Sequence, residues 1–438
     1  MKSVCPKSSL RTRRYHSLIV NEPPILMRPL SFCMVTTFFP PENFGGDGIF
    51  IYRLANALAE DGHRVDVVHC TDSYRLLGGK PMPPVVNHPN VTTFPLKSPF
   101  GALSPILTQA TGAPWLKSRA LKKILDRGHD VVHWHNISLV GGPRVLRMGR
   151  GIRLYTTHEH WLVCPTHVLL KYNKEPCVTK DCLRCVLAHK RPPQAWRITG
   201  MIERELKNVD GMISPSAFTR RRHEAELPVS MKVIPYFLPE LPEEPLEQRQ
   251  AAESILATES GPYFLYVGRL EILKGVHTLL PVMARRPDFR LLIAGEGLHG
   301  TELRRQFAAL PNVRFLGNQP RHVLHRLYER ATAVVVPSIC YEVLGQIIIE
   351  GFAAKTPSIV RNLGAPPDIV ADAAGGLAYD TDAELEAAMD QLTRNPELRK
   401  KMGESGFAHY LERFTKEAHF RDYFAMIRGI ASAKGISL

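Results

Sequence analysis

Short apolar segments alternate with amphipathic segments along most of the chain. Apolar runs typical of buried strands occur at Ser31–Phe39, Arg64–Cys70, Asp130–His135, Arg153–Thr157 and Gly211–Ser214. Between the first two runs, residues 49–60 carry apolar side chains at helical spacing. This alternation predicts parallel β-sheets covered by helices on both faces, because parallel strands are joined by crossover connections.

A second series of the same kind begins after residue 261. Its strand-like runs are Tyr263–Val267, Arg290–Ala294, Val313–Leu316, Ala333–Val336 and Pro357–Val360. Residues 239–261, between the two series, are rich in Pro and Glu, as is typical of an inter-domain linker. We therefore expect an α/β protein with two doubly wound domains, 31–238 and 262–413, that face each other across a cleft. Residues 414–438 are expected to form a helix that packs back towards the first domain.

Composition and charge narrow the class of protein. Of the 438 residues, 44% are hydrophobic and 22% are charged, which is ordinary for a globular protein. No apolar run reaches the roughly 18 residues of a membrane-spanning helix. The formal net charge of +14 favours anionic partners such as phosphates, nucleic acid or an acidic membrane surface. Residues 1–30 are basic and lack the apolar core of a signal peptide, so we expect a disordered extension on a cytoplasmic protein.

Two motifs of the second domain carry side chains suited to binding a diphosphate. Arg269 ends the first strand and Lys274 follows five residues later at a helix start, where two cations can clamp a diphosphate. Further along, Glu342 and Glu350 flank a segment that is expected to become helical at Gly345. The amides at that helix start can hold phosphate, and a carboxylate at each end can accept hydrogen bonds from hydroxyls.

Residues 295–300 read Gly-Glu-Gly-Leu-His-Gly and match the dinucleotide-binding pattern GxGxxG. The acidic residue that such a site needs about twenty positions later is absent, which argues against NAD. Gly295 and Gly297 can still bring the backbone close to a ligand.

Histidines gather at two strand ends of the first domain. His133 and His135 end one strand, and His158 and His160 end the next, where both ends are expected to face the cleft. We single out His158, with hydrogen bonding to a substrate as its expected role.

Taken together, these motifs resemble those of the retaining glycosyltransferases of family 4, over about residues 31 to 430. They are GGxG at Gly45-Gly46, a His-rich strand end, GR-x4-KG, GxG and E-x7-E. The resemblance implies the GT-B fold and transfer of a sugar from a nucleotide-diphosphate sugar, a UDP- or GDP-sugar above all. It also implies a saccharide or lipid-linked acceptor, retention at the anomeric carbon and no catalytic metal.

The resemblance also assigns roles by position. His158 would lie beside the donor sugar, Glu342 would contact that sugar, and Glu350 would bind the ribose. Arg269 and Lys274 would neutralise the diphosphate. The rest of the nucleotide-sugar site would be formed by Gly45, Gly46, Gly295, Gly297, Val343, Leu344 and Gly345. Two motifs depart from the family: E-x-F-G is Glu342-Val343-Leu344-Gly345 here, and P-N-G is Pro235-Tyr236-Phe237.

Four of the eight cysteines cluster in the first domain. Cys164, Cys177, Cys182 and Cys185 are spaced C-x12-C-x4-C-x2-C. Four thiolates can close a structural zinc site, although the first two spacings are not those of standard zinc fingers. Structural zinc and free thiols both remain open, and an iron–sulfur centre or a disulfide is a weaker alternative.

Basic segments suggest where the first domain meets other molecules. Lys117, Arg119, Lys122 and Lys123 lie on an expected helix, and Arg220-Arg221-Arg222 forms a second patch. Each patch is expected to be either a solvated helix surface or a surface that docks on an anionic membrane. Alternatives to a glycosyltransferase are a basic, zinc-stapled nucleic-acid-binding protein, and a sugar-nucleotide epimerase or phosphorylase with the same fold. Because most aromatics lie within apolar strands rather than on stacking surfaces, we expect no nucleic-acid partner.

Overall fold

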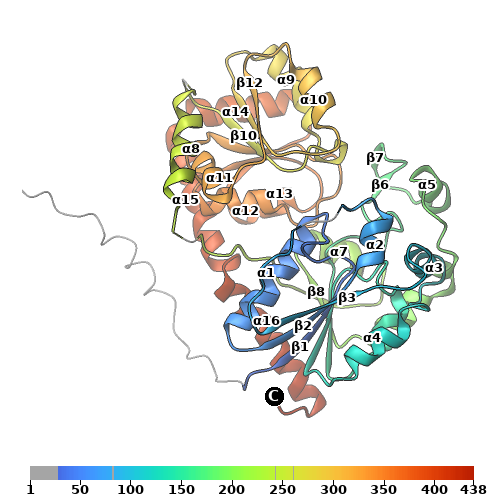
Figure 1. Ribbon diagram of the computed structural model, residues 1–438. Helices are drawn as coiled ribbons and strands as arrows, with labels where there is room; N and C mark the ends of the chain where they lie inside the picture. Colours follow the sequence, from blue (N-terminus) through green and yellow to red (C-terminus); the bar gives the residue numbers. More distant parts are fainter. Residues whose placement is uncertain (1–27, 81–82, 242, 260) are drawn as a thin grey trace, which may run out of the picture.

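The computed structural model describes residues 28–80, 83–241, 243–259 and 261–438. The expected disordered extension lies almost wholly outside these residues. The described chain forms two lobes, each built around one parallel sheet, with the connection near residue 240 and helix α16 (Lys416–Lys434) passing between them (Figure 1).

The first lobe contains a seven-stranded sheet in the order β3-β2-β1-β4-β5-β8-β9, in which every pairing is parallel. Its strands are β1 (Ser31–Val35), β2 (Arg64–Cys70), β3 (Val91–Leu96), β4 (Val131–Trp134), β5 (Ile152–Thr156), β8 (Gly211–Ser214) and β9 (Met231–Val233). Its helices are α1 (Gly46–Glu60), α2 (Thr71–Leu76), α3 (Leu103–Thr111), α4 (Ser118–Leu125), α5 (Cys182–Ala188), α6 (Met201–Leu206) and α7 (Ala217–Glu224), with 3-10 turns η2 (Pro143–Arg147) and η3 (Ala195–Thr199). The central strand β4 is buried along its whole length, as expected for a sheet covered on both faces.

The second lobe contains a six-stranded parallel sheet in the order β12-β11-β10-β13-β14-β15. Its strands are β10 (Phe264–Val267), β11 (Leu291–Ala294), β12 (Val313–Gly317), β13 (Ala333–Val336), β14 (Ser358–Arg361) and β15 (Gly376–Tyr379). Its helices are α8 (Leu246–Ala257), α9 (Leu280–Arg285), α10 (Gly300–Phe307), α11 (Arg321–Arg330), α12 (Gln346–Ala353), α13 (Pro366–Asp372), α14 (Asp382–Arg394) and α15 (Pro396–Arg413), with 3-10 turns η4 (Ile272–Lys274) and η5 (Val276–Leu279). In both sheets the strand order reverses at the first strand, so the carboxyl ends of the strands border a crevice.

The expected linker at 239–261 is wrong over most of its length. Helix α8 occupies residues 246–257 and packs on α11, with Ala252 and Leu256 buried. The Pro and Glu residues that suggested a linker lie before the helix and on its exposed side, so only the few residues before α8 connect the lobes.

Helix α16 leaves the second lobe and packs on the first (Figure 1). Tyr423 is fully buried, and its hydroxyl lies 2.9 Å from Nδ1 of His133. Lys434 forms an ion pair with Asp210, and Lys416 forms one with Asp61. One apolar cluster runs through both lobes and includes Phe50, Leu265 and Ile348, so the lobes share a packed interface.

Residues 164–190 form an insert with little regular structure. It contains a two-stranded antiparallel ladder of β6 (Leu170–Lys171) and β7 (Glu175–Pro176), followed by α5. In Figure 1 this insert projects beside the second lobe. None of the helices in the described ranges is both long and apolar enough to cross a lipid bilayer.

Candidate active site

Lys274 is positioned by a turn that only glycine can complete. Turn η4 ends at Lys274, and Gly275 follows with φ of 71°, a left-handed conformation that side chains disfavour. A Cβ at Gly275 would lie 1.9 Å from the carbonyl oxygen of Pro337, which follows β13. Gly275 of the GR-x4-KG motif therefore lets Lys274 lie next to the carboxyl end of β13, the strand that pairs with β10.

Lys274 meets Glu342 at that strand end. Its Nζ lies 2.6 Å from Oε1 of Glu342, and the Ser338 hydroxyl donates to the same oxygen at 2.7 Å. Burial alone would raise the pKa of Glu342, but the charge and hydrogen bond of Lys274 outweigh burial and lower it. Burial would likewise lower the pKa of Lys274, and the Glu342 carboxylate raises it instead. Both groups are therefore charged at neutral pH.

Arg269 lies close enough for its charge to help lower the pKa of Glu342. Its guanidinium is half exposed and pairs with Glu271 at 2.6 Å. The two cations of the motif thus lie on the same side of the cleft, one buried against a carboxylate and the other reachable from solvent.

Helix α12 begins beside this cluster. Gly345 is its N-cap, with φ of 95°, and Gln346 is its first residue. The first-turn amides of a helix lack helical partners and carry partial positive charge, so this helix start is suited to an anion. Across the cleft, a Cβ at Gly46 would lie only 3.6 Å from Nε2 of Gln346. The starts of α1 and α12 therefore face each other.

The loop between Glu342 and Gly345 is held by the first lobe. The Thr219 hydroxyl donates to the carbonyl of Val343 at 3.1 Å, and Nε2 of His160 donates to the carbonyl of Tyr341 at 3.2 Å. The ring of Phe218 stacks on that of Tyr341 with centroids 5.5 Å apart. The cleft is closed at this point, and sequence reasoning did not foresee these contacts between lobes.

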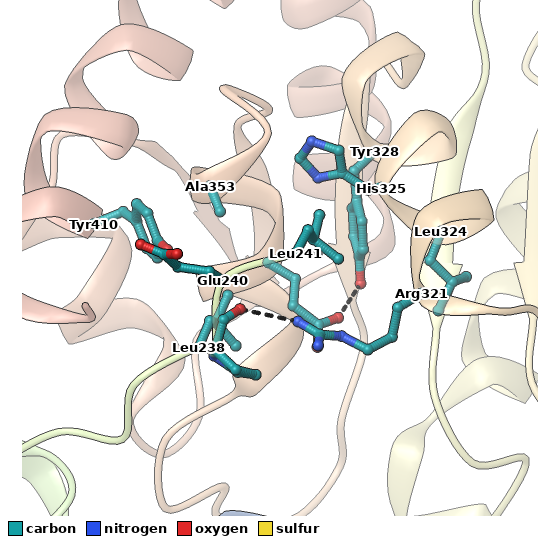
Figure 2. Close-up of a pocket in the computed structure, with 11 residues that line it drawn as sticks. Leu238, Glu240, Leu241, Arg321, Leu324, His325, Tyr328, Ala353 and Tyr410 are labelled. Carbon is teal, nitrogen blue, oxygen red and sulfur yellow. Dashed lines mark hydrogen bonds between the residues drawn. The ribbon is translucent and has the colours of Figure 1, made fainter. Parts of the chain in front are cut away.

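Glu350 lies in the middle of α12, beside a cavity of about 160 Å³. Its Oε2 accepts a hydrogen bond from the Tyr328 hydroxyl at 2.8 Å, and burial raises its pKa. Figure 2 shows the Tyr328 hydroxyl and the Arg321 side chain converging on this cavity from α11. Arg53 of α1 is also near Glu350, and its buried Nη1 has no hydrogen-bond partner among the described residues.

His158 lies in a row of hydrogen-bonded neutral side chains. Its Nδ1 is 2.5 Å from the Tyr236 hydroxyl, and its Nε2 is 2.8 Å from Nδ1 of His135. Burial, together with the neighbouring His419, lowers the pKa of His158 to about 3, so the ring is neutral. Tyr236 stands where the family has Asn in P-N-G, and it stacks on Phe50 of α1. Both ring nitrogens of His158 are thus occupied within the first lobe.

Two carboxylates beside this row were missed by sequence reasoning. Asp47, the second residue of α1, accepts a hydrogen bond from Asn136 at 3.3 Å, and burial with the charge of Glu159 raises its pKa. Glu159 follows His158 in sequence and bonds Nδ1 of His167 at 2.7 Å. Asp47 directly follows the Gly45-Gly46 motif. An acidic residue at that position, next to a motif assigned to the site, could have identified it from the sequence.

The glycines of the GxG motif have a packing explanation. A Cβ at Gly295 would lie 2.0 Å from the carbonyl oxygen of Gly268, and one at Gly297 would lie 2.5 Å from that of Leu270. These glycines let the loop after β11 approach the loop after β10, where Arg269 lies.

The four clustered cysteines lie close to one another in the insert, since burial raises the pKa of Cys177 and the charges of Cys164, Cys182 and Cys185 add to that rise. Nowhere in the described ranges are three or more His, Cys, Asp or Glu side chains arranged so that they could hold a metal ion. Cys164 and Cys185 are buried, whereas Cys182 is exposed and Cys177 is half-buried. The sulfur of Cys185 accepts a hydrogen bond from the amide of Tyr172, and that of Cys164 contacts the Thr166 hydroxyl. Structural zinc at Cys164, Cys177, Cys182 and Cys185 stays a prediction, beside free thiols.

The two basic patches differ in how far their cations are free. Lys117 is buried, and its Nζ donates to the carbonyl of Leu139 at 2.9 Å, so it belongs to the interior. Of the other patch, Arg221 pairs with Asp368 of the second lobe, Arg222 with Glu226 and Arg220 with Glu224. Arg119, Lys122 and Lys123 of α4 are exposed, as expected for a solvated helix surface, whereas each arginine of the second patch has an acidic partner.

Two family profiles match the sequence, one on each lobe. The profile described as Glycosyltransferase Family 4 matches residues 44–238, and the one described as Glycosyl transferases group 1 matches residues 247–409. Together they extend from the start of α1 to the end of α15.

Relatives and solved structures agree with these matches. A glycogen synthase of Mycobacterium tuberculosis is 27% identical over 386 residues, covering 83% of this chain and 86% of the relative. The sucrose-phosphate synthase of Thermosynechococcus elongatus superposes with a TM-score of 0.70 at 21% identity, over 92% of this chain and 100% of that one. HepE of Anabaena, solved in complex with UDP, superposes with a TM-score of 0.63 at 16% identity, over 91% of this chain and 100% of that one.

Proposed function

The chain belongs to glycosyltransferase family 4 and has the GT-B fold, and on that premise we propose that it moves a sugar from a nucleotide-diphosphate sugar to an acceptor hydroxyl with retention of anomeric configuration. The observation that carries this proposal is the cluster of Lys274, Glu342 and Arg269 beside the start of α12.

This cluster is suited to a leaving diphosphate. Negative charge grows on the phosphate oxygen as the sugar departs, and fixed cations with helix amides stabilise such charge without rearranging. In the proposal, Lys274 and Arg269 neutralise the diphosphate while the amides after Gly345 hold its oxygens, with Val343 and Leu344 shaping the loop. Because the Arg269 guanidinium is half exposed, it would leave Glu271 and bind the diphosphate, and water would then solvate the Glu271 carboxylate.

The two glutamates would orient the donor by accepting hydrogen bonds from hydroxyls. Glu342 is held by Lys274 and Ser338 and would meet the sugar. Glu350 follows Glu342 by eight residues, in the middle of α12, and would meet the ribose, with Tyr328 fixing its other oxygen. The orphaned Nη1 of Arg53 would approach the nucleoside from the opposite lobe.

The acceptor would enter from the first lobe, next to Gly45 and Gly46. Asp47 is the carboxyl group there whose pKa is raised by burial and by Glu159, which is the direction that general-base work requires. Neutral His158 would present its ring to the donor sugar only if it gave up a partner, so its proposed role is to shape the sugar pocket. Donor base, donor sugar and acceptor class stay open in this proposal, with UDP- and GDP-sugars the first to test.

The test is to incubate the purified chain with UDP-, GDP- and ADP-sugars and an acceptor mixture, and to follow product by NMR. A product whose anomeric bond has the same configuration as that of the donor sugar supports the proposal. A product with the opposite configuration refutes retention. Release of an epimerised sugar would favour an epimerase, whereas a sugar 1-phosphate formed with inorganic phosphate would favour a phosphorylase. Affinity for nucleic acid with no reaction of any donor would refute the enzyme assignment.

A further inference from the structure

The two lobes differ in net charge. Residues 31–238 contain 27 Lys and Arg against 16 Asp and Glu, whereas residues 239–438 contain 23 against 25. The excess of the described chain therefore lies in the first lobe, and the proposed donor half is close to neutral. A phosphate-binding donor site does not explain this distribution, because Arg269 and Lys274 belong to the other lobe.

Within the first lobe, acidic residues are absent from one long stretch. No Asp or Glu occurs between Asp72 and Asp126, and the cations there are Arg75, Lys80, Lys97, Lys117, Arg119, Lys122 and Lys123. All of these except Lys117 are exposed. A second acid-free stretch, residues 182–202, lies against the first, since η3 packs on α3 and the Trp196 indole donates to the carbonyl of Gln109.

Large apolar side chains are exposed on the same elements. Of the sixteen exposed large hydrophobic residues in the described part of the chain, thirteen lie in the first lobe. Phe100, Leu103 and Ile106 follow one another at helical spacing on α3 and the turn before it, with exposed fractions of 59%, 53% and 41%. Leu76 and Leu77 at the end of α2, Trp115 after α3 and Ile198 of η3 add to them. We call this set, with its cations Arg75, Lys80 and Lys97, the α3 surface.

The α3 surface borders the cleft. Helix α2 starts directly after the carboxyl end of β2, and the turn that holds Phe100 follows the carboxyl end of β3. Because these strand ends face the crevice between the lobes, the surface lies at its edge on the β3 side of the sheet. Figure 1 shows α3 at the right-hand edge of the first lobe and α2 further in, on the side that faces the second lobe.

We propose that the α3 surface docks the first lobe on an anionic lipid bilayer and so presents the cleft to an acceptor that is anchored in that bilayer. The α3 surface presents aromatic and aliphatic side chains among Arg75, Lys80 and Lys97, and Glu42 is the acid that lies within reach of Lys97. This combination matches the headgroup region of an anionic bilayer, which is apolar on its inner side and negative on its outer side. Nucleic acid would complement the cations but would leave isolated Leu, Ile and Phe side chains in contact with water or phosphate. The lipid-linked acceptor rests on the proposed glycosyltransferase function, whereas the docking itself does not.

Trp115 gives this surface its own spectroscopic signal. The other three tryptophans, Trp134, Trp161 and Trp196, are buried, whereas Trp115 is 59% exposed and lies near the Arg144 guanidinium. Insertion of Trp115 into the headgroup region would shift the fluorescence maximum of the protein to shorter wavelength. Trp115→Phe should abolish that shift while leaving binding largely intact.

The experiment measures cosedimentation of the full chain with vesicles of phosphatidylcholine alone or with 30% phosphatidylglycerol. We expect binding to the anionic vesicles only. Phe100→Ser with Leu103→Ser should weaken it at least about tenfold, and Arg75→Glu with Lys80→Glu should do the same. The matched controls lie in the second lobe, where Leu246→Ser with Leu298→Ser and Lys400→Glu with Lys401→Glu should change binding less than twofold.

Three results would overturn the docking proposal: no binding to anionic vesicles, unchanged binding by the Phe100/Leu103 variant, or equal loss in the second-lobe controls. Single-stranded RNA that displaces the vesicles and binds the Ser variant as tightly as the parent would assign the surface to nucleic acid instead. Vesicle binding needs neither donor nor acceptor, so its failure would leave glycosyl transfer standing. A chain that binds vesicles but transfers no sugar would refute the proposed function alone.

Discussion

The second lobe places a buried ion pair at its strand ends, whereas the strand ends of the first lobe carry a row of neutral histidines that are hydrogen-bonded to tyrosines. Lys274 and Glu342 hold each other ionised at a strand end. In the first lobe, burial holds the pKa of His133, His135, His158 and His419 far below the ordinary value, and hydrogen bonds with Tyr236 and Tyr423 take the place of ion pairs.

We expect the ion pair to stabilise the leaving group and the neutral network to fix the geometry of the site. Fixed charges stabilise a charged leaving group strongly, so changes in the second lobe should alter the rate by large factors. A neutral hydrogen-bonded network contributes geometry, and removal of one bond from it should have a smaller effect. The following predictions use this contrast, in order of decreasing effect.

Replacement of Lys274 is expected to have the largest effect. Lys274→Ala removes a cation from the proposed diphosphate site and leaves the Glu342 carboxylate without its partner. We expect kcat/KM to fall at least about a hundredfold. Steady-state kinetics on Lys274→Ala and on Lys400→Ala, an exposed lysine of α15, would check this. Equal activity of both variants would remove Lys274 from the site.

Mild acid should destabilise the first lobe. The folded-state pKa of His158 is about 3 and that of His419 about 4, both below the unfolded value near 6.5, so the unfolded chain binds more protons as pH falls. The stability present above pH 6.5 is therefore lost on acidification, by up to about 1.4 kcal/mol per pH unit for each such histidine.

Urea unfolding between pH 7 and pH 5 measures this effect. Glu342, whose pKa is lowered, stays ionised throughout, whereas Asp47 and Glu350, whose pKa values burial raises, oppose the loss of stability as the folded chain protonates them. We expect the free energy of unfolding to fall by several kcal/mol, about 1.4 per titrating histidine per pH unit at most. His419→Gln should flatten the dependence. A free energy that does not change over this range would contradict the buried neutral network.

Loss of the Tyr236 hydroxyl should slow turnover without weakening donor binding. Tyr236→Phe removes the hydrogen bond to Nδ1 of His158, so the ring and its tautomer are less well fixed. We expect kcat to fall about tenfold with KM for the donor nearly unchanged. Tyr423→Phe is the control, since it removes a comparable bond to His133. Both variants should lose about 1 kcal/mol of stability, so an equal loss of activity in both would indicate a purely structural role.

The smallest effect is expected where the lobes touch. Thr219→Val removes the hydrogen bond to the carbonyl of Val343 and keeps the shape of the side chain. KM for the donor should rise about two- to threefold, because one neutral hydrogen bond holds the loop less firmly. Thr393→Val, which removes a similar bond to the carbonyl of Met389 on α14, should leave KM unchanged.

Sequence motifs predicted the second lobe better than the first. Lys274, Glu342 and Gly345 all lie on short turns after strands of one sheet, and the family resemblance placed them in one nucleotide-sugar site. The Pro and Glu residues around 239–261 concealed helix α8, whose burial on α11 depends on residues far along the chain. The pairing of His158 with Tyr236 joins residues 78 positions apart, and no local pattern encodes it.

Packing decided the remaining differences. Lys117 has the sequence context of an exposed helical lysine, yet its Nζ finds the carbonyl of Leu139 inside the lobe. The cysteine spacing predicted that four sulfurs would lie near one another, and the charges of Cys164, Cys182 and Cys185 all reach Cys177, although two of the four cysteines are buried and one is exposed. Whether such a side chain is buried or exposed depends on how distant parts of the chain pack around it, which local sequence does not show.

Calorimetric titration with nucleotides tests the central claim most directly. If a diphosphate lies between Arg269, Lys274 and the start of α12, then UDP or GDP should bind at least about tenfold more tightly than the corresponding monophosphate, and Lys274→Ala should abolish that preference. Absence of binding by any nucleoside diphosphate, or an unchanged preference in Lys274→Ala, would contradict the claim.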